Sequence, residues 1–197
     1  MKKLNLIART QLGVPHPIGV RTVALAASVF LLGCAAAFGA PMTPVGGMGH
    51  LSAQDRTFVK KAAEGGMGEV ALGQLAAERA TRPEVKAFGQ RMVTDHGQAN
   101  DNLKSVAASE GFTLPSGPGP VQISQQAKLE RLHGAAFDNA YIATMIKEHK
   151  TDAAGFATEA AAGRDRGVRR FAAQTVPVVK SHLAMIEAIA HHKHPMM

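Results

Sequence analysis

Four long segments of this chain carry apolar residues at the three- and four-residue spacing of an α-helix, and connections of very unequal length join them. The segments are residues 52–80, 83–110, 135–162 and 165–192. Only a few residues separate the first from the second and the third from the fourth, so each pair is predicted to form an antiparallel hairpin. The hairpins are joined by a much longer link, which can cross helices of ~42 Å at 1.5 Å per residue.

The predicted fold class is therefore all-α: a four-helix bundle over residues 52–192 in which two antiparallel hairpins are joined by a long crossover. This is the ferritin-like arrangement. Within the crossover, residues 112–123 are predicted to be a loop, and Ser124 to begin a short extra helix that ends near His133. A short internal repeat agrees with paired hairpins, because Glu84–Phe88 resembles Gly167–Phe171 and both follow a turn.

The first 40 residues read as an export signal that is not part of the fold. Four basic residues precede an uncharged apolar run over residues 22–40 that ends in small side chains. Two cleavage sites stay open: a lipoprotein signal in which the thiol of Cys34 is acylated, and ordinary cleavage after Ala37. An uncleaved anchor is a third alternative, because a membrane span needs ~20 apolar residues. The protein is predicted to be exported to the periplasm or the outer membrane.

Those four basic residues also account for much of the net charge of +7. From residue 41 onward, 18 basic residues stand against 15 acidic ones. The folded part therefore lacks the basic field of a nucleic-acid-binding protein. With no Trp and a single Tyr, it also lacks the aromatic surfaces on which bases stack. Residues 41–51, rich in Pro and Gly, are predicted to be a flexible tether, and residues 193–197 a disordered tail.

Three histidines lie on apolar helix faces, each near the middle of a different predicted helix, and an acid occupies the matching place on the remaining helix. The midpoints of antiparallel helices of equal length lie at one level, so these side chains are predicted to share one layer of the core. The layer consists of His96, His149, His182 and Glu69, with Asp95, Glu148 and Asp152 as supporting acids.

Two interpretations of this layer stay open. Imidazoles with one carboxylate can bind zinc, copper, iron or nickel, and bundle metal sites are built from inward-facing side chains. The same residues can also form a buried hydrogen-bonded network that fixes helix register. These helices contain no Glu-x-x-His, which argues against the usual di-iron site. Convergence of the three rings and Glu69 to ligand distance would favour a metal, and separate partners would favour the network.

Catalytic motifs are not apparent in the sequence. It shows no Ser/His/Asp arrangement and no dinucleotide-binding glycine motif, and Gly65–Gly68 lacks the lysine of a phosphate-binding loop. The protein is therefore predicted not to be an enzyme. The cofactor that its residues could hold is a transition-metal ion.

Several segments taken together resemble the bacterial domain-of-unknown-function 4142 family. They are Phe58–Val70, Val85–His96, Met145–His149 and Lys180–Leu183, and the resemblance spans residues 54–190. It implies a ferritin-like helical domain of exported proteins that are often described as outer-membrane proteins. It also implies acid–histidine pairs, here Asp95–His96 and Glu148–His149, and no established reaction.

Two functions of different classes follow. The first is a non-catalytic envelope protein that acts by interaction or in stress tolerance, with the His/acid layer serving the structure. The alternative is a periplasmic metal-binding bundle protein. Association with a membrane would come through an uncleaved anchor or a lipidated Cys34, and no protein partner is predicted.

Overall fold

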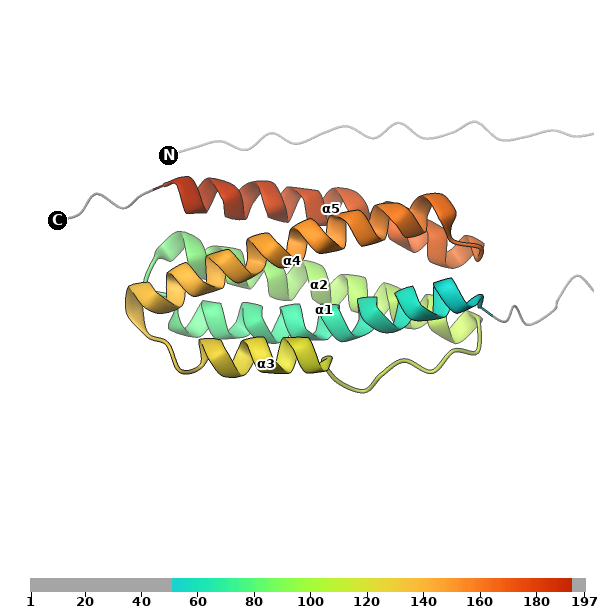
Figure 1. The fold of residues 1–197 in the computed structure, drawn as a ribbon, viewed down its shortest axis with the longest axis horizontal. Coiled ribbons are helices and arrows are strands. Elements are labelled where there is room, and N and C mark those ends of the chain that lie inside the picture. Colours follow the sequence, from blue (N-terminus) through green and yellow to red (C-terminus); the bar gives the residue numbers. More distant parts are fainter. Residues whose placement is uncertain (1–50, 193–197) are drawn as a thin grey trace, which may run out of the picture. The chain divides into compact units, whose positions relative to one another are not determined.

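The computed structural model describes residues 51–192. The export signal with Cys34, most of the tether and the tail lie outside this range. Figure 1 shows five helices and, within residues 51–192, no strand. The helices are α1 (Ala53–Arg79), α2 (Pro83–Ser109), α3 (Pro120–Leu129), α4 (Gly134–Ala162) and α5 (Arg166–His191). The predicted all-α class is confirmed.

Local sequence signals explain where the long helices begin and end. Ser52 caps α1 in a capping box, in which its side chain accepts from the backbone of Asp55 and the Asp55 carboxylate accepts from the backbone of Ser52. Pro83 occupies the first turn of α2, where no backbone donor is lost. Gly111 follows α2 with a φ of 62°, a left-handed conformation that glycine adopts without strain.

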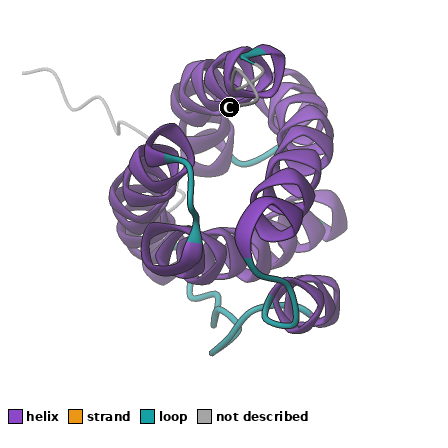
Figure 2. Cartoon of the chain, turned by 90° about the vertical axis from the view of Figure 1, so that its left-hand side faces the viewer, coloured by secondary structure: helices purple, strands orange, loops and turns teal. Residues whose placement is uncertain are grey.

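The four long helices form two antiparallel hairpins, α1–α2 and α4–α5, and the crossover between them contains α3 (Figure 1). Seen end-on, the long helices form a ring and α3 lies outside it (Figure 2). The prediction for the crossover is wrong in detail: the short helix begins at Pro120, not Ser124, and ends at Leu129. Gly119 and Pro120, read as loop residues, instead form the N-terminal turn of that helix.

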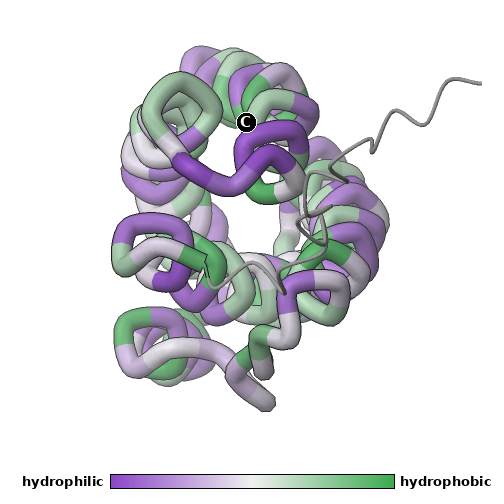
Figure 3. The backbone as a smooth tube through the Cα atoms, turned by 90° about the vertical axis from the view of Figure 1, so that its right-hand side faces the viewer, coloured by the Kyte–Doolittle hydropathy of each residue, from purple (hydrophilic) through white to green (hydrophobic). Residues whose placement is uncertain are grey.

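The core consists of two apolar clusters with a polar layer between them. One cluster, near the α1–α2 turn, includes Leu72, Phe88 and Tyr141, and the other, towards the opposite end, includes Val59 and Phe171. Each helix alternates between apolar and polar residues along its length (Figure 3). The polar layer is therefore a break in the core, and it lies where the sequence places the histidines.

Helices α1 and α2 approach one another backbone to backbone. A Cβ atom added at Gly73 would lie 2.7 Å from the carbonyl oxygen of Gly89, and one added at Gly89 would lie 2.6 Å from the carbonyl oxygen of Gly73. No larger residue fits this contact without separating the helices. The two glycines thus set the distance between α1 and α2.

Each hairpin has its turn closed by an aspartate of the other hairpin. Asp138, on α4, accepts hydrogen bonds from the backbone of Thr81 and Arg82 in the α1–α2 turn. Asp55, on α1, accepts from the backbone of Arg164 and Asp165 in the α4–α5 turn. Both aspartates are fully buried.

These reciprocal contacts reveal an internal repeat. Asp55 and Asp138 lie 83 positions apart in the sequence. The end of α1 at Arg79 and the end of α4 at Ala162 have the same spacing. So do the start of α2 and the start of α5. The similarity between residues 84–88 and 167–171 has this same spacing. The two hairpins are therefore two copies of one design, related by a shift of 83 positions.

No helix within residues 51–192 combines the length and the apolar character needed to span a bilayer.

Candidate metal centre

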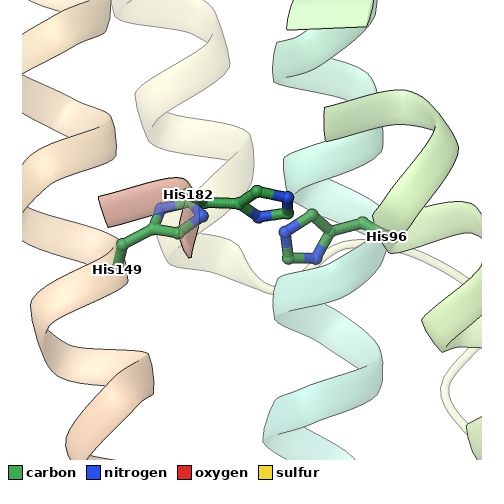
Figure 4. Close-up of side chains that lie close together, drawn as sticks. All are labelled: His96, His149 and His182. Atoms are coloured by element: carbon green, nitrogen blue, oxygen red, sulfur yellow. The ribbon is translucent and has the colours of Figure 1, made fainter. Parts of the chain in front are cut away.

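Three helices each bring one imidazole to the middle of the bundle. His96 lies on α2, His149 on α4 and His182 on α5, and all three are buried. The ring centroids are 5.2 Å (His96–His182), 5.5 Å (His149–His182) and 5.8 Å (His96–His149) apart. One ring nitrogen of each histidine lies within 4.8 Å of one from each of the others. The rings face one another from the three helices (Figure 4).

The outer nitrogen of each ring has an acceptor that fixes the position of its proton. His149 Nδ1 lies 3.0 Å from the carbonyl oxygen of Met145. A carbonyl oxygen only accepts, so this nitrogen carries the proton. His182 Nε2 lies 2.8 Å from Asp95 Oδ2. His96 Nδ1 lies 2.8 Å from Glu69 Oε2.

The inner nitrogens consequently carry lone pairs. His96 Nε2, His149 Nε2 and His182 Nδ1 are buried, and none has a hydrogen-bond partner among residues 51–192. A neutral imidazole that donates from one nitrogen presents an acceptor at the other. Buried acceptors without a donor are costly, and here three converge. A cation placed among them would satisfy all three at once.

Glu69 closes the fourth side of the centre from α1 and is 5% exposed. While its Oε2 binds His96, its Oε1 lies 3.7 Å from His149 Nε2. At 3.7 Å this contact is longer than a hydrogen bond, and neither atom has a hydrogen-bond partner among residues 51–192. The carboxylate thus extends the set of inward-facing donors to three nitrogens and one oxygen.

Burial keeps the imidazoles neutral. It lowers the pKa of His96 and of His149 to about 4, and it also lowers the pKa of His182. The surrounding carboxylates oppose these changes without reversing them. At neutral pH the rings are therefore unprotonated, the form in which imidazole binds a metal.

Burial has the opposite effect on the acids of the centre. It raises the pKa of Glu69 to about 7 and the pKa of Asp152 to about 8. The two carboxyls lie close enough for each to influence the pKa of the other. Burial also raises the pKa of Glu148. An outer cavity of about 420 Å³ beside α3 is lined by all three acids.

The donor set suits a borderline transition metal. Three imidazole nitrogens and one carboxylate oxygen are ligands that zinc and copper accept. Around a tetrahedral ion with Zn–N bonds of ~2.1 Å, the ligand atoms lie about 3.4 Å apart. The histidine ligand atoms lie within 4.8 Å of one another, so the rings would have to move closer together, and Glu69 would have to exchange its contact with His96 for the ion. Hydrogen-bonded outer nitrogens are the usual companions of such ligands.

Comparison with known proteins places the chain in a family. Residues 40–189 match the family described as Domain of unknown function (DUF4142). The chain belongs to the DUF4142 family. A crystal structure of a DUF305 fragment from Deinococcus radiodurans has a similar fold, with a TM-score of 0.63 at 15% sequence identity over 72% of this chain and 97% of that chain. The comparison with curated proteins finds no match.

The DUF4142 domain brings together the four residues that the sequence places in one layer: His96, His149, His182 and Glu69. Their role as metal ligands stays a prediction. The supporting acids have different partners from those their positions suggest. Asp95 binds His182 and not its neighbour His96, whereas Asp152 lines the same outer cavity as Glu69.

Some functional groups of the DUF4142 domain were not predicted from the sequence. Glu148 makes no contact with the neighbouring His149 ring comparable to that of Asp95 with His182; its half-buried side chain lies towards Gln125 of α3. The Met145 carbonyl that orients His149 carries no sequence signal at all. Asp55 and Asp138 could have been found by extending the repeat, since both occupy the same place in it.

Proposed function

We propose that the domain binds one divalent transition-metal ion through His96, His149, His182 and Glu69. The observation that carries this proposal is the orientation of the rings. One nitrogen of each imidazole donates to a protein acceptor, the other is buried without a hydrogen-bond partner among residues 51–192, and ring nitrogens of the three histidines lie within 4.8 Å of one another. Zinc and copper are the test metals, because nitrogen-rich sites with one carboxylate suit both.

The competing function, in which the layer serves the structure alone, requires that every polar group of the layer has a hydrogen-bond partner. A hydrogen-bonded network stabilises a core when each member is satisfied, and a partly satisfied one is costly. Here the outer nitrogens are satisfied, but no residue between 51 and 192 supplies a donor to the inner ones. A cation accounts for the inner nitrogens, whereas a register-fixing network does not.

Metal titration tests this proposal directly. The full-length protein, purified without an affinity tag and stripped with a chelator, is titrated with Zn²⁺ and Cu²⁺ in a calorimeter. We expect one ion per chain, and the unfolding free energy should rise by about 2.7 kcal/mol when free metal reaches 100 times Kd. His149→Ala removes a ligand and should abolish the high-affinity site.

A matched control separates the centre from the histidines near the C-terminus. The exposed imidazoles of His191 and His192 lie at and just after the end of α5, away from the buried layer. Replacing both by Ala should leave the affinity of the centre unchanged. The proposal is wrong if the stripped protein takes up no stoichiometric metal, or if H149A binds as tightly as the unmodified chain.

We further propose that the domain functions after export. The apolar run over residues 22–40, behind its basic start, supports this location. N-terminal sequencing and cell fractionation test it: a processed chain in the envelope is expected, and an unprocessed chain in the cytoplasm would contradict it. Cys34→Ala distinguishes the two cleavage routes, because only the lipoprotein route requires this thiol.

A further inference from the structure

A cavity of about 210 Å³ lies directly against the candidate metal centre. Glu69 and His96 of the centre form part of its wall, together with Asp152. Much of the remaining wall is apolar, and its other polar residues are Lys61, Asn100, Thr151 and Thr175. At ~30 Å³ per water molecule in the liquid, the cavity has room for a ligand of only a few heavy atoms.

The internal repeat explains why a cavity exists at this position. A shift of 83 positions pairs each residue of the centre with one in the other hairpin: His149 with Gly66, His182 with Ala99, His96 with Val179 and Glu69 with Asp152. All four counterparts line the cavity. The cavity is therefore the second copy of the centre, with small apolar residues in place of the three imidazoles.

The opposite side of the centre is closed by aromatic packing. The ring of Phe88 lies 6.3 Å from that of His149 and 6.2 Å from that of His182, centroid to centroid. Phe88 in turn packs edge-to-face on Tyr141, which is fully buried. An ion held by the three rings and Glu69 would thus be shielded on that side, so a further ligand, such as the fifth ligand that copper(II) accepts, would have to reach it from the side of the cavity.

Charge indicates which ligand would occupy that position. A divalent ion bound by three neutral imidazoles and the Glu69 carboxylate keeps one positive charge. A net charge in a buried site is costly unless a counter-charge lies beside it. One monoanion at the open position removes the imbalance, and the Asn100 amide in the cavity wall can donate a hydrogen bond to it.

We propose that the cavity formed by Gly66, Ala99, Val179 and Asp152 binds a small monoanion as an additional ligand of the metal ion. This inference rests on the proposed metal centre. It assigns different duties to the two sites that the repeat relates, each built from both hairpins: one site holds the metal, and the other admits the exogenous ligand.

Azide is the probe, because a bound azide gives copper(II) a ligand-to-metal charge-transfer absorption that can be titrated. The full-length protein loaded with one Cu²⁺ should show a saturable azide band. Ala99→Leu fills the cavity and should weaken azide binding at least tenfold, with copper affinity changed by less than about twofold. Ala173→Leu, at an exposed position of α5, is the matched control and should bind azide normally.

A second variant that fills the cavity keeps the test possible if A99L does not fold. Gly155 lines the same cavity, and a Cβ added there meets no atom within 4 Å. Gly155→Leu should therefore fold at least as well as the original chain and also weaken azide binding. The inference is overturned if the copper-loaded chain shows no azide band, or if azide affinity is unchanged in a folded filling variant. Failure to bind copper at all would instead refute the proposed metal centre.

Discussion

The carbonyl of Met145 decides which nitrogen of His149 faces the centre. It lies one helical turn before the histidine and accepts a hydrogen bond from Nδ1–H. Nε2 is therefore left as the inward ligand atom. Asp95 does the same for His182 from a neighbouring helix. At the scale of single residues, ligand orientation therefore depends on groups that would never touch the metal.

Replacing Asp95 tests this dependence. Without its carboxylate, the ring of His182 can rotate or adopt the other tautomer, so we expect Asp95→Ala to weaken metal binding by about 10- to 100-fold. Calorimetric titration with Zn²⁺ measures the change, and circular dichroism should show an unchanged fold. Asp101→Ala, at an exposed position on the same helix, should bind normally. Equal affinities of D95A and D101A would contradict the role of Asp95.

The buried acids predict how the stability of metal-stripped protein depends on pH. Glu69 and Asp152, with folded pKa values of about 7 and about 8, keep protons that the unfolded chain loses near its ordinary values of 4.5 and 3.8. Stability from these groups is present at low pH and is lost as the pH rises towards 8. The histidines, whose pKa values are lowered, act in the opposite direction, mainly below their ordinary value of 6.5.

Between pH 6.5 and 8 the contribution of the two acids exceeds what is left of the histidine titration, so the unfolding free energy of stripped protein should fall by about 1 kcal/mol. Urea unfolding at several pH values measures this. Bound metal ionises Glu69 in the folded state and should reduce the fall, as should Asp152→Asn. A stability that rises over this range would show that the two carboxyls do not hold their protons.

At the scale of helices, the contact between Gly73 and Gly89 fixes the separation of α1 and α2. These two helices carry Glu69 and His96, which meet at 2.8 Å. A wider separation would break the pair. The glycines therefore support the centre as well as the packing of the hairpin.

Gly89→Ala should destabilise the protein by about 1 to 3 kcal/mol, because the added methyl group meets the backbone of α1. Alanine is otherwise the better helix former, so Gly97→Ala, whose Cβ meets nothing within 4 Å, should stabilise by about 0.5 to 1 kcal/mol. Chemical denaturation of both variants measures the contrast. The same sign of change in both would rule out a steric contact at Gly89.

The turn-closing aspartates allow a second test at this scale. Asp138 accepts from two backbone donors and from the hydroxyl of Thr81, and all these bonds involve a charged acceptor. We expect Asp138→Ala to cost about 2 to 3 kcal/mol of unfolding free energy. Asp55→Ala should cost a similar amount, since Asp55 has the equivalent role. If either variant is no less stable than D101A, the bonds contribute nothing to folding.

The helices and the histidine layer could be predicted from the sequence because both depend on local periodicity. Ser52, Pro83 and Gly111 mark helix ends through backbone chemistry that does not involve the rest of the fold. The hydrogen-bond partners of the side chains in this layer could not be predicted. Asp95 and His96 are adjacent in sequence but point about 100° apart on a helix, so Asp95 meets His182 of another helix instead.

At the scale of the whole molecule, the polar layer divides the core into two apolar clusters. Each cluster holds one end of the bundle together, and the layer between them contributes little apolar burial. Metal binding would therefore act where the core is weakest. The two sites that the repeat relates differ in chemistry, because three imidazoles meet at one and a cavity lies at the other.

The reciprocal aspartates have an evolutionary consequence. A hairpin that closes its partner's turn and has its own turn closed in return presents the interface of a symmetric homodimer. An ancestral gene that encoded one such hairpin would have assembled in pairs, with two identical centres related by the dimer axis. Duplication and fusion would have removed the identity that symmetry imposes. One of the two centres, each built from both halves, could then keep its ligands while the other lost them, and the crossover with α3 would be the point of fusion.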